Sequence, residues 1–468
     1  MSTFIQYLER RIRQLPCACA FALASGVALA ASVETSAIPP PPPAPAASSP
    51  APVESPAPET WAVHGQITNV TQWHGHFRSP YSGTNSLQLD GRTEETTDMT
   101  LYGGVRLWKG AEFWLNPELD QGFGLDNTVG VAGFPNGEAY KIGANTPYLR
   151  LPRAFIRQTI DLGGINEPVL PAANQLAATR ASENLTLTIG KFSAADIFDT
   201  NGYAHDPRRD LLNWSIIDAG AFDYAADSWG YTYGAAAEWS KSSWTARGGV
   251  FQLSKIPNGK VAGVHFNQFM LVSELEQRYE WDGQSGKVKL LGFLNRGRMA
   301  NYRDATAYGL AQGTAPDVVP VRRYQSRPGI ALNLEHRISI DLGAFARASV
   351  NDGTKEAYEF TEINKSFSGG LSLKGTFWGR ADDTLAIAGV VNGLSSAARA
   401  YFAAGGIGIL IGDGGLNYGA EKIVEVSYAA FLTPHLALSL DYQHVTNPAY
   451  NRDRGPVSIY GLRAHADF

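Results

Sequence analysis

Residues 457–468 show a strict two-residue alternation, and this pattern most constrains what the chain can fold into. Side chains of a β-strand point alternately to its two faces, so one face of this segment is apolar and the other could not lie in lipid. A soluble sandwich can share the pattern, but a strand ending on an aromatic residue is better explained by a strand end at a membrane interface. One face would carry Tyr460, Leu462, Ala464, Ala466 and Phe468, and the other Gly461, Arg463, His465 and Asp467.

Similar alternation recurs from residue 61 onward, without a sustained helical period. Alternating strands average to near zero hydropathy, so a membrane barrel can look soluble by composition. The chain fits this description, with 49 glycines, 11% aromatic and only 18% charged residues. We expect an all-β, transmembrane antiparallel β-barrel of about 16 strands over residues 61–468. The predicted strands start near residues 61, 99, 112, 149, 184, 229, 242, 266, 286, 326, 341, 366, 383, 420, 435 and 456.

The connections between these runs mostly alternate between short and long. Bacterial outer-membrane barrels have short periplasmic turns and longer external loops, so this asymmetry predicts the orientation of the barrel. The connector over 161–183 is long where a short turn is expected, which is an exception to the pattern. An even strand number closes the sheet without a free edge, as lipid requires, and about sixteen strands leave a water-filled lumen.

The N-terminal region reads as an export signal followed by a spacer. Arg10, Arg11 and Arg13 precede an uncharged, alanine-rich run that contains an A-x-A site at 28–30, which predicts a signal peptide over residues 1–30. The two cysteines, Cys17 and Cys19, lie inside it, so the exported chain would contain no thiol. Residues 31–60 are rich in proline and alanine and predict an extended periplasmic leader.

Signals for enzyme chemistry are weak. The chain has no G-x-S-x-G nucleophile motif, and the two histidines at 74 and 76 lack the cysteine or carboxylate company that a metal site needs. Glu118 and Asp120 share one strand face, where ion pairs in the lumen are the commoner outcome. The mildly acidic net charge of −5 gives no support for nucleic-acid binding. We therefore expect no enzyme, no metal and no cofactor.

Strand parity predicts which polar side chains point into the lumen. If Ala154, Ile156 and Ile160 face lipid, then Arg153 and Arg157 face water. Arginine outnumbers lysine 27 to 12, and a planar guanidinium with five donors suits hydroxyl-rich ligands, whose apolar ring faces can lie on aromatic side chains. The alternative is that these charges only pair with each other. The candidate pore-lining residues are Trp114, Glu118, Arg153, Arg157, Trp214, Asn333, Glu335 and Arg347.

The longest predicted loop, 192–228, contains tryptophan, phenylalanine and isoleucine residues and is not especially hydrophilic. A loop of this composition is not expected to extend freely into water. It would either fold inward and narrow the pore or pack on the rim of the barrel.

Several segments resemble the carbohydrate-selective porins of the OprB-like family. They include Gly190-Lys191-Phe192 with the 199–206 stretch and Trp214, the 342–353 segment with Phe345, Arg347 and Ser349, and Asp441-Tyr442-Gln443 before Gly455-Pro456-Val457. The likeness spans about residues 62–468. It implies a barrel of about sixteen strands that passes glucose and other neutral sugars by diffusion through an arginine-bearing constriction.

The sequence therefore predicts a carbohydrate-selective porin of the bacterial outer membrane. Its partners would be sugars as permeating solutes, outer-membrane lipid and, for a homotrimer, two further copies of the chain. A non-selective or anion-preferring porin is the main alternative. A barrel enzyme and a soluble periplasmic binding module are the further rivals.

Overall fold

The computed structural model of the chain describes residues 57–139, 143–226, 230–261 and 263–468. The chain divides into two units, residues 1–52 and 53–468, and the account below concerns the second. The predicted signal peptide (1–30), both cysteines and most of the predicted leader (31–60) lie outside the described residues. These assignments stay predictions.

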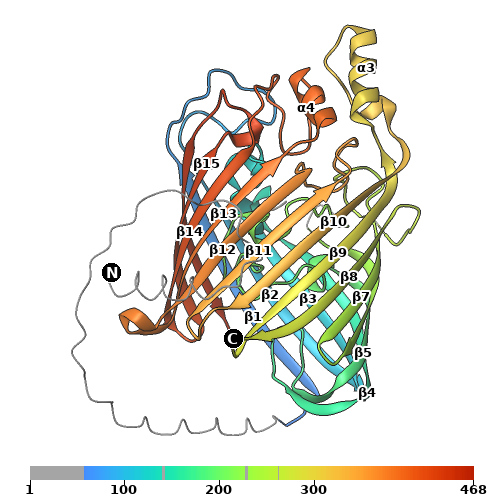
Figure 1. Cartoon of the computed structure of the whole chain (residues 1–468), viewed down its shortest axis with the longest axis vertical. Coiled ribbons are helices and arrows are strands. Elements are labelled where there is room, and N and C mark those ends of the chain that lie inside the picture. Colours follow the sequence, from blue (N-terminus) through green and yellow to red (C-terminus); the bar gives the residue numbers. More distant parts are fainter. Residues whose placement is uncertain (1–56, 140–142, 227–229, 262) are drawn as a thin grey trace, which may run out of the picture. The chain divides into compact units, whose positions relative to one another are not determined.

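Sixteen antiparallel strands in the described residues form a closed barrel in which each strand pairs with its neighbours in sequence and β16 returns to β1 (Figure 1). The predicted all-β barrel of about sixteen strands is confirmed. The strands are β1 (Trp61–His74), β2 (Arg92–Trp108), β3 (Ala111–Phe123), β4 (Gly143–Val169), β5 (Ala178–Phe192), β6 (Thr232–Lys241), β7 (Trp244–Gln252), β8 (Phe269–Trp281), β9 (Gln284–Met299), β10 (Arg323–Arg337), β11 (Leu342–Asn351), β12 (Lys365–Gly375), β13 (Arg380–Gly393), β14 (Glu421–Thr433), β15 (Leu436–Thr446) and β16 (Val457–Asp467).

The closing seam joins the two ends of the barrel sequence. β16 pairs antiparallel with β1 from Gln66 opposite Asp467 to His74 opposite Ile459. Phe468 extends this pairing, because its N–H donates to the Gly65 carbonyl (3.0 Å) and its carbonyl accepts from the Gly65 N–H (3.1 Å). The seam leaves no free strand edge, which a sheet in lipid requires.

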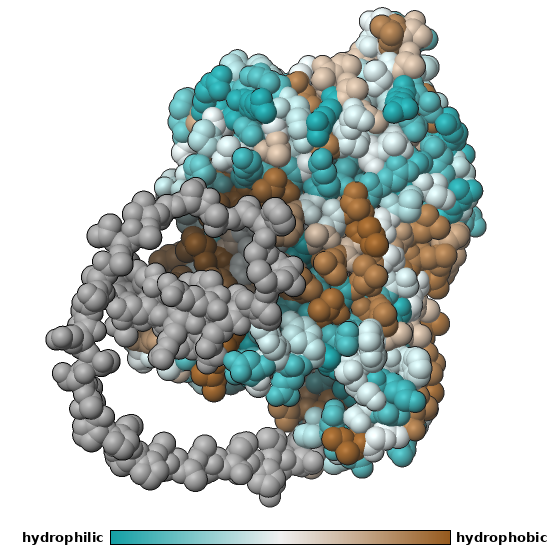
Figure 2. Space-filling model, in the orientation of Figure 1, coloured by the Kyte–Doolittle hydropathy of each residue, from teal (hydrophilic) through white to brown (hydrophobic). Residues whose placement is uncertain are grey.

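The barrel is apolar outside and polar inside. Leu149 and Val63 are 73% and 55% exposed, whereas the lumen-facing Thr68, Thr100 and Glu118 are 0% exposed. Apolar side chains gather across the strands on the face visible in Figure 2, and hydrophilic ones gather at the end that carries the long loops. This inversion of the usual pattern of a soluble protein is what a lipid-facing barrel needs.

Tryptophans ring the barrel at one end, where the strands are joined by short turns. Trp108, Trp239, Trp244 and Trp281 lie at strand ends beside these turns and are 39–59% exposed, and Trp61 begins β1 there with 68% exposure. Such a girdle marks a membrane–water interface. We call this end the turn end and the opposite end the loop end.

The loop end carries the α-helices α3 (Tyr302–Gln312) and α4 (Ser396–Ala403) (Figure 1). The short helix α2 (Trp214–Ile217) belongs to the segment between β5 and β6. Short 3-10 helices are η1 (Leu125–Thr128), η2 (Gly137–Ala139), η3 (Ala194–Asp196), η4 (Val319–Val321), η5 (Thr376–Trp378) and η6 (Pro448–Tyr450). Within the described ranges, no helix has both the length and the apolar character that a membrane crossing needs.

The expectation of a long connector over 161–183 is wrong. β4 and β5 continue through this region as a paired ribbon that reaches Val169 opposite Ala178, so only residues 170–177 form the turn. The ribbon contains register shifts around Gly163, and Gly163 and Gly164 have positive φ values of 145° and 85°. Glycine is the residue that suits such β-bulges, and the bulges disguised the strand alternation.

Candidate functional site

The segment 193–226, between β5 and β6, folds into the barrel, and we call it the lumen loop. Arg347 of β11 donates to the carbonyl of Ile216 in this loop (2.9 Å). Arg463 of β16 donates to the carbonyl of Pro207 (2.6 Å). Of the two arrangements left open by the sequence, the structure has the inward one. The loop lies against the wall formed by the later strands, because both arginines belong to that wall.

Buried carboxylates attach the lumen loop as well. Glu425 of β14 accepts the backbone N–H groups of Leu212 (2.5 Å) and Asn213 (3.1 Å). Asp223, in the loop itself, accepts an N–H from Tyr358 (2.7 Å) and pairs with Arg327 of β10 (2.6 Å). The Asp223 and Arg327 side chains are both 0% exposed. Buried charges are stable only when they are paired and hydrogen-bonded, so these contacts fix the loop to the wall.

Aromatic packing completes this attachment. The ring of Trp214 stacks on Phe134 with centroids 5.4 Å apart and meets the edge of Phe360 at 4.8 Å. Phe222 packs on Phe293 of β9 at 5.1 Å. Aromatic pairs of this kind add about 0.5–1.5 kcal/mol each beyond their area burial. The lumen loop is thus part of a packed interior and not a freely moving segment.

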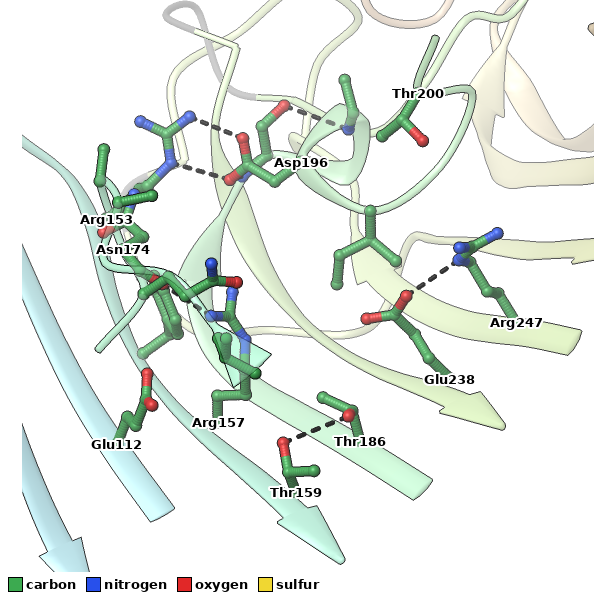
Figure 3. Close-up of a pocket in the computed structure, with 18 of the residues that line it drawn as sticks. Glu112, Arg153, Arg157, Thr159, Asn174, Thr186, Asp196, Thr200, Glu238 and Arg247 are labelled. Carbon is green, nitrogen blue, oxygen red and sulfur yellow. Dashed lines mark hydrogen bonds and ion pairs between the residues drawn. The ribbon is translucent and has the colours of Figure 1, made fainter. Parts of the chain in front are cut away.

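The space that remains in the lumen is a cavity of about 1220 Å³ between the lumen loop and the wall of the earlier strands. Its lining reaches from Lys109 and Arg278, beside the turns, to Gly230 and Tyr231, which precede β6 at the loop end. Side chains of several strands surround this space in Figure 3. The cavity therefore follows the barrel from one end of the strands toward the other.

Arg153 on the wall and Asp196 on the lumen loop both line the cavity and contact each other directly (Figure 3). The guanidinium of Arg153 donates in bidentate fashion to Asp196, with Nε–Oδ2 2.8 Å and the second contact 2.6 Å. Ser193 caps η3 and its N–H donates to Asp196 (3.0 Å), which holds the carboxylate in place. Burial by itself would raise the pKa of Asp196, but the Arg153 guanidinium and the Ser193 N–H lower that pKa below its usual value.

Other cavity arginines are also neutralised by carboxylates. Arg247 of β7 contacts Glu238 (2.9 Å), Glu274 (2.8 Å) and Glu276 (3.0 Å). Arg157 differs, because its guanidinium donates to the carbonyl of Asn174 (2.7 Å) and makes no ion pair with any residue in the described ranges. The lining thus offers many N–H donors, and carboxylates compensate the charge of Arg153 and Arg247 among them.

An aromatic ring lies beside the arginines. The guanidinium groups of Arg153 and Arg150 are 4.8 Å and 5.4 Å from the centroid of the Tyr231 ring. Arginine on an aromatic face is a favourable cation–π contact, and it holds the guanidinium plane in a fixed orientation. Tyr231 was not among the predicted site residues, because the alternating run that starts near residue 229 places it on the apolar face of a strand. In the structure it precedes β6 and lines the cavity.

Arg150 is a second residue that strand parity missed. Between the pairs Asn116–Arg153 and Glu118–Arg150, β4 contains one residue more than β3, so the register shifts at Pro152. This bulge turns Arg150 to the same face as Arg153, where it pairs with Glu118 and lines the cavity. Proline cannot donate to the ladder and commonly marks a bulge, so Pro152 was the signal in the sequence.

The predicted pore-lining residues fall into three groups. Arg153, Arg157 and Trp214 line the cavity. Trp114 and Glu118 point inward from β3 but are 0% exposed, with Glu118 in ion pairs to Arg150 and Arg208. Their part in binding a solute stays a prediction.

Three further predicted residues, on the opposite wall, lie beneath the lumen loop. Arg347 is 2% exposed, and Asn333 donates to the carboxylate of Asp199 in the loop (2.6 Å). Glu335 accepts the N–H of Gly202 (2.7 Å). These three side chains contact the lumen loop and do not line the cavity, so they hold the lumen loop in place. Their part in binding a solute also stays a prediction.

At the loop end, Glu362 connects two external loops. Its carboxylate accepts N–H groups from Ile409 (2.9 Å), Leu410 (2.8 Å) and Ile411 (2.8 Å). Burial raises the pKa of Glu362 to about 7 from the usual 4.5, against the opposite effect of these hydrogen bonds. The folded loops therefore bind the proton more tightly than the unfolded chain, so this contribution to stability is full below pH 4.5 and is lost as the pH rises toward 7.

Among the described residues, no group of three or more His, Cys, Asp or Glu side chains is arranged to hold a metal ion. The chemistry of the cavity is hydrogen bonding and charge compensation along a wet path through a lipid-facing barrel. A closed barrel with a polar lumen narrowed by an inward loop defines an outer-membrane channel of the porin class.

The comparisons with known proteins give the family. The model for the carbohydrate-selective porin, OprB family, matches residues 84–468, and the chain belongs to that family. Its location is the bacterial outer membrane. The structure is similar to the high-pH structure of Pseudomonas putida OprB, with a TM-score of 0.66 at 15% identity over 87% of this chain and 94% of that one.

A further similar structure is the outer-membrane channel DcaP of Acinetobacter baumannii, with a TM-score of 0.49 at 11% identity over 87% of this chain and 97% of that one. No curated protein matches the chain. The family is one of porins.

Proposed function

We propose that this porin passes neutral mono- and small oligosaccharides of the glucose type by passive diffusion across the outer membrane. The observation that carries the proposal is the compensated arginine of the cavity, Arg153, which is clamped by Asp196 and lies on Tyr231. A guanidinium in this state still presents N–H donors to a hydroxyl group. It does not create the strong positive field that would select anions.

The surroundings support a polyol as the solute. Carboxylates and amides accept hydroxyl protons, and aromatic faces cover the apolar face of a pyranose ring. The cavity lining supplies Glu112, Asn174 and Tyr231 for these contacts. Replacing part of the hydration shell of a solute needs no energy source, so the transport is diffusion down a gradient. Assembly into a homotrimer stays a prediction.

Liposome swelling tests the proposal. Vesicles that contain the purified protein should swell faster in a monosaccharide than in a zwitterionic amino acid of equal size, and vesicles with boiled protein serve as the control. Equal swelling rates in the two solutes would contradict the sugar preference and indicate a non-selective porin.

The anion-preferring alternative has one observation in its favour. Arg157 lines the cavity without an ion pair in the described part of the chain. The reversal potential of single channels in a potassium chloride gradient decides between the two. A potential near zero favours the sugar channel, whereas a strong anion preference favours the alternative.

A further inference from the structure

The turn between β4 and β5, residues 170–177, does not project away from the barrel, and we call it the turn-end hairpin. Its tip is closed by a bridge between Ala172 and Gln175, with N–O distances of 3.1 Å and 3.0 Å in the two directions. Between them Asn174 has a φ of 59°, a conformation that asparagine tolerates better than most residues. The hairpin is thus a defined turn at the turn end of the barrel (Figure 1).

The tip is held toward the lumen. The side-chain amide of Asn116 in β3 donates to the Asn174 side-chain oxygen (2.9 Å), and Arg157 of β4 donates to the Asn174 carbonyl (2.7 Å). Leu176 is 0% exposed, although the residues on the outer side of the tip are exposed. Ala172, Ala173 and Asn174 all line the cavity.

A second set of contacts fixes the base of the hairpin. The N–H of Glu59 donates to the carbonyl of Ala177 (3.0 Å), and the Ala177 N–H donates to the Glu59 carboxylate (2.7 Å). Arg106 of β2 donates to both carbonyls, that of Glu59 (2.8 Å) and that of Ala177 (3.1 Å). We call these three residues the Glu59 latch. The latch joins the segment before β1 to the hairpin across the turn end.

The role of Arg157 follows from this arrangement. A guanidinium has five N–H donors, and the contacts of Arg157 in the described residues use one of them, on Asn174. The side chain lines the cavity next to Asn174 (Figure 3). A hydroxyl-rich solute that reaches this level therefore meets a charged donor and, beside it, the amide of Asn174 as both donor and acceptor.

We propose that the turn-end hairpin is a second constriction, in series with the lumen loop, and that Arg157 and Asn174 are its specificity-determining residues for polyol solutes. The Glu59 latch sets its width, because it ties the hairpin to β2 and to the entry of β1. The choice of polyols rests on the proposed function above. The constriction itself does not, because a narrowed path restricts every ion and solute.

Thiol modification in planar bilayers tests the constriction. In a background of Cys17→Ser and Cys19→Ser, Ala173→Cys places a thiol at the tip, and Glu167→Cys places one on the exposed stem of the same hairpin as a matched control. A cationic methanethiosulfonate reagent should lower the single-channel current of the Ala173→Cys protein in one step and leave the control unchanged. An unchanged current in Ala173→Cys, with modification verified by mass, would overturn the constriction.

Removing the contacts of the Glu59 latch tests whether the latch sets the width of the constriction. Glu59→Ala should raise the swelling rate in a trisaccharide relative to a monosaccharide by about twofold, because larger solutes gain most from a wider path. Glu167→Ala, in the part of β4 that leads into the hairpin and without a contact to the latch, should keep the ratio of the wild type. The same ratio in Glu59→Ala as in the wild type would overturn the role of the latch.

The outcomes separate this inference from the proposed function. If the thiol reagent blocks the Ala173→Cys channel while sugars and amino acids swell liposomes equally, the constriction stands and the sugar preference fails. If the sugar preference holds and Arg157→Gln changes the relative swelling rates in different sugars, the assignment of Arg157 stands. Unchanged relative rates in Arg157→Gln would remove that residue from the constriction.

Discussion

Replacing Arg347 by methionine should loosen the lumen loop without weakening the barrel. Every hydrogen bond of the Arg347 side chain in the described residues goes to that loop: to the carbonyls of Ile216 (2.9 Å), Ala204 (2.9 Å) and Asp199 (3.0 Å), and to the Asp199 carboxylate (3.2 Å). The strand pairs of β11 are backbone contacts that the substitution leaves intact. Methionine fills a similar volume without a polar atom that needs a partner.

The size of the effect follows from burial. Both side chains of the Arg347–Asp199 pair are 1% exposed, and removing one partner of a buried pair costs about 3–5 kcal/mol. At 1.4 kcal/mol per decade, the docked loop loses a factor between about 10² and about 4 × 10³ relative to undocked arrangements. Arg463, Glu425 and Asp223 still hold other parts of the loop, so we expect local fluctuation and not complete release.

Single-channel recording and thermal unfolding in detergent measure the two sides of this prediction. Arg347→Met should raise open-channel current and current noise and shift the half-saturation for sugar, while the unfolding midpoint of the barrel stays near that of the wild type. Arg298→Met, an exposed arginine at the loop end of β9, is the matched control and should change neither. A wild-type current in Arg347→Met would refute the role of Arg347 as an anchor of the loop.

Two further predictions concern charge. Asp196→Asn removes the carboxylate that compensates Arg153, so the reversal potential in a potassium chloride gradient should shift toward anion preference; no shift would mean that Arg153 exerts no field on the permeating ions. In the wild type, amide protection of 409–411, corrected for intrinsic exchange, should fall as the pH rises from 4.5 toward 7, because Glu362 binds its proton in the folded loops with a pKa of about 7. Glu362→Gln should remove this dependence, and an unchanged pH profile in that variant would exclude Glu362 as its source.

The sequence was enough to predict the barrel, because each strand repeats one simple rule. The alternation that placed Arg153 and Arg157 inside and Ile156 outside holds in the structure, and the family match agrees with the motifs. The two-residue alternation is a local pattern, and it recurs in each strand. It fails at bulges, and this is why Arg150 beside Pro152 was missed and why the ribbon at 161–169 was mistaken for a loop.

The alternation of side chains does not predict how the two walls of the lumen differ. Arg157 and Arg347 obey the same parity, yet one lines the cavity and the other lies beneath the lumen loop. The choice depends on the contact between Arg347 and Asp199, which are 148 residues apart in sequence, and on equally distant contacts such as Glu425 with Leu212. An arginine that points into the lumen can therefore either line the cavity or hold the lumen loop, and strand parity alone does not distinguish the two.

The different roles of the two lumen walls have a physical reason. A buried arginine or carboxylate needs full compensation, and backbone groups of a loop supply it at fixed geometry. On one wall, Arg327, Arg347 and Arg463 donate hydrogen bonds to the lumen loop and fix it in place. The opposite wall, with Arg153 and Arg157, keeps its guanidinium groups beside open space. The proposed selectivity for an uncharged solute would require both walls, because donors can discriminate between hydroxyl arrangements only when the distance across the lumen is held constant.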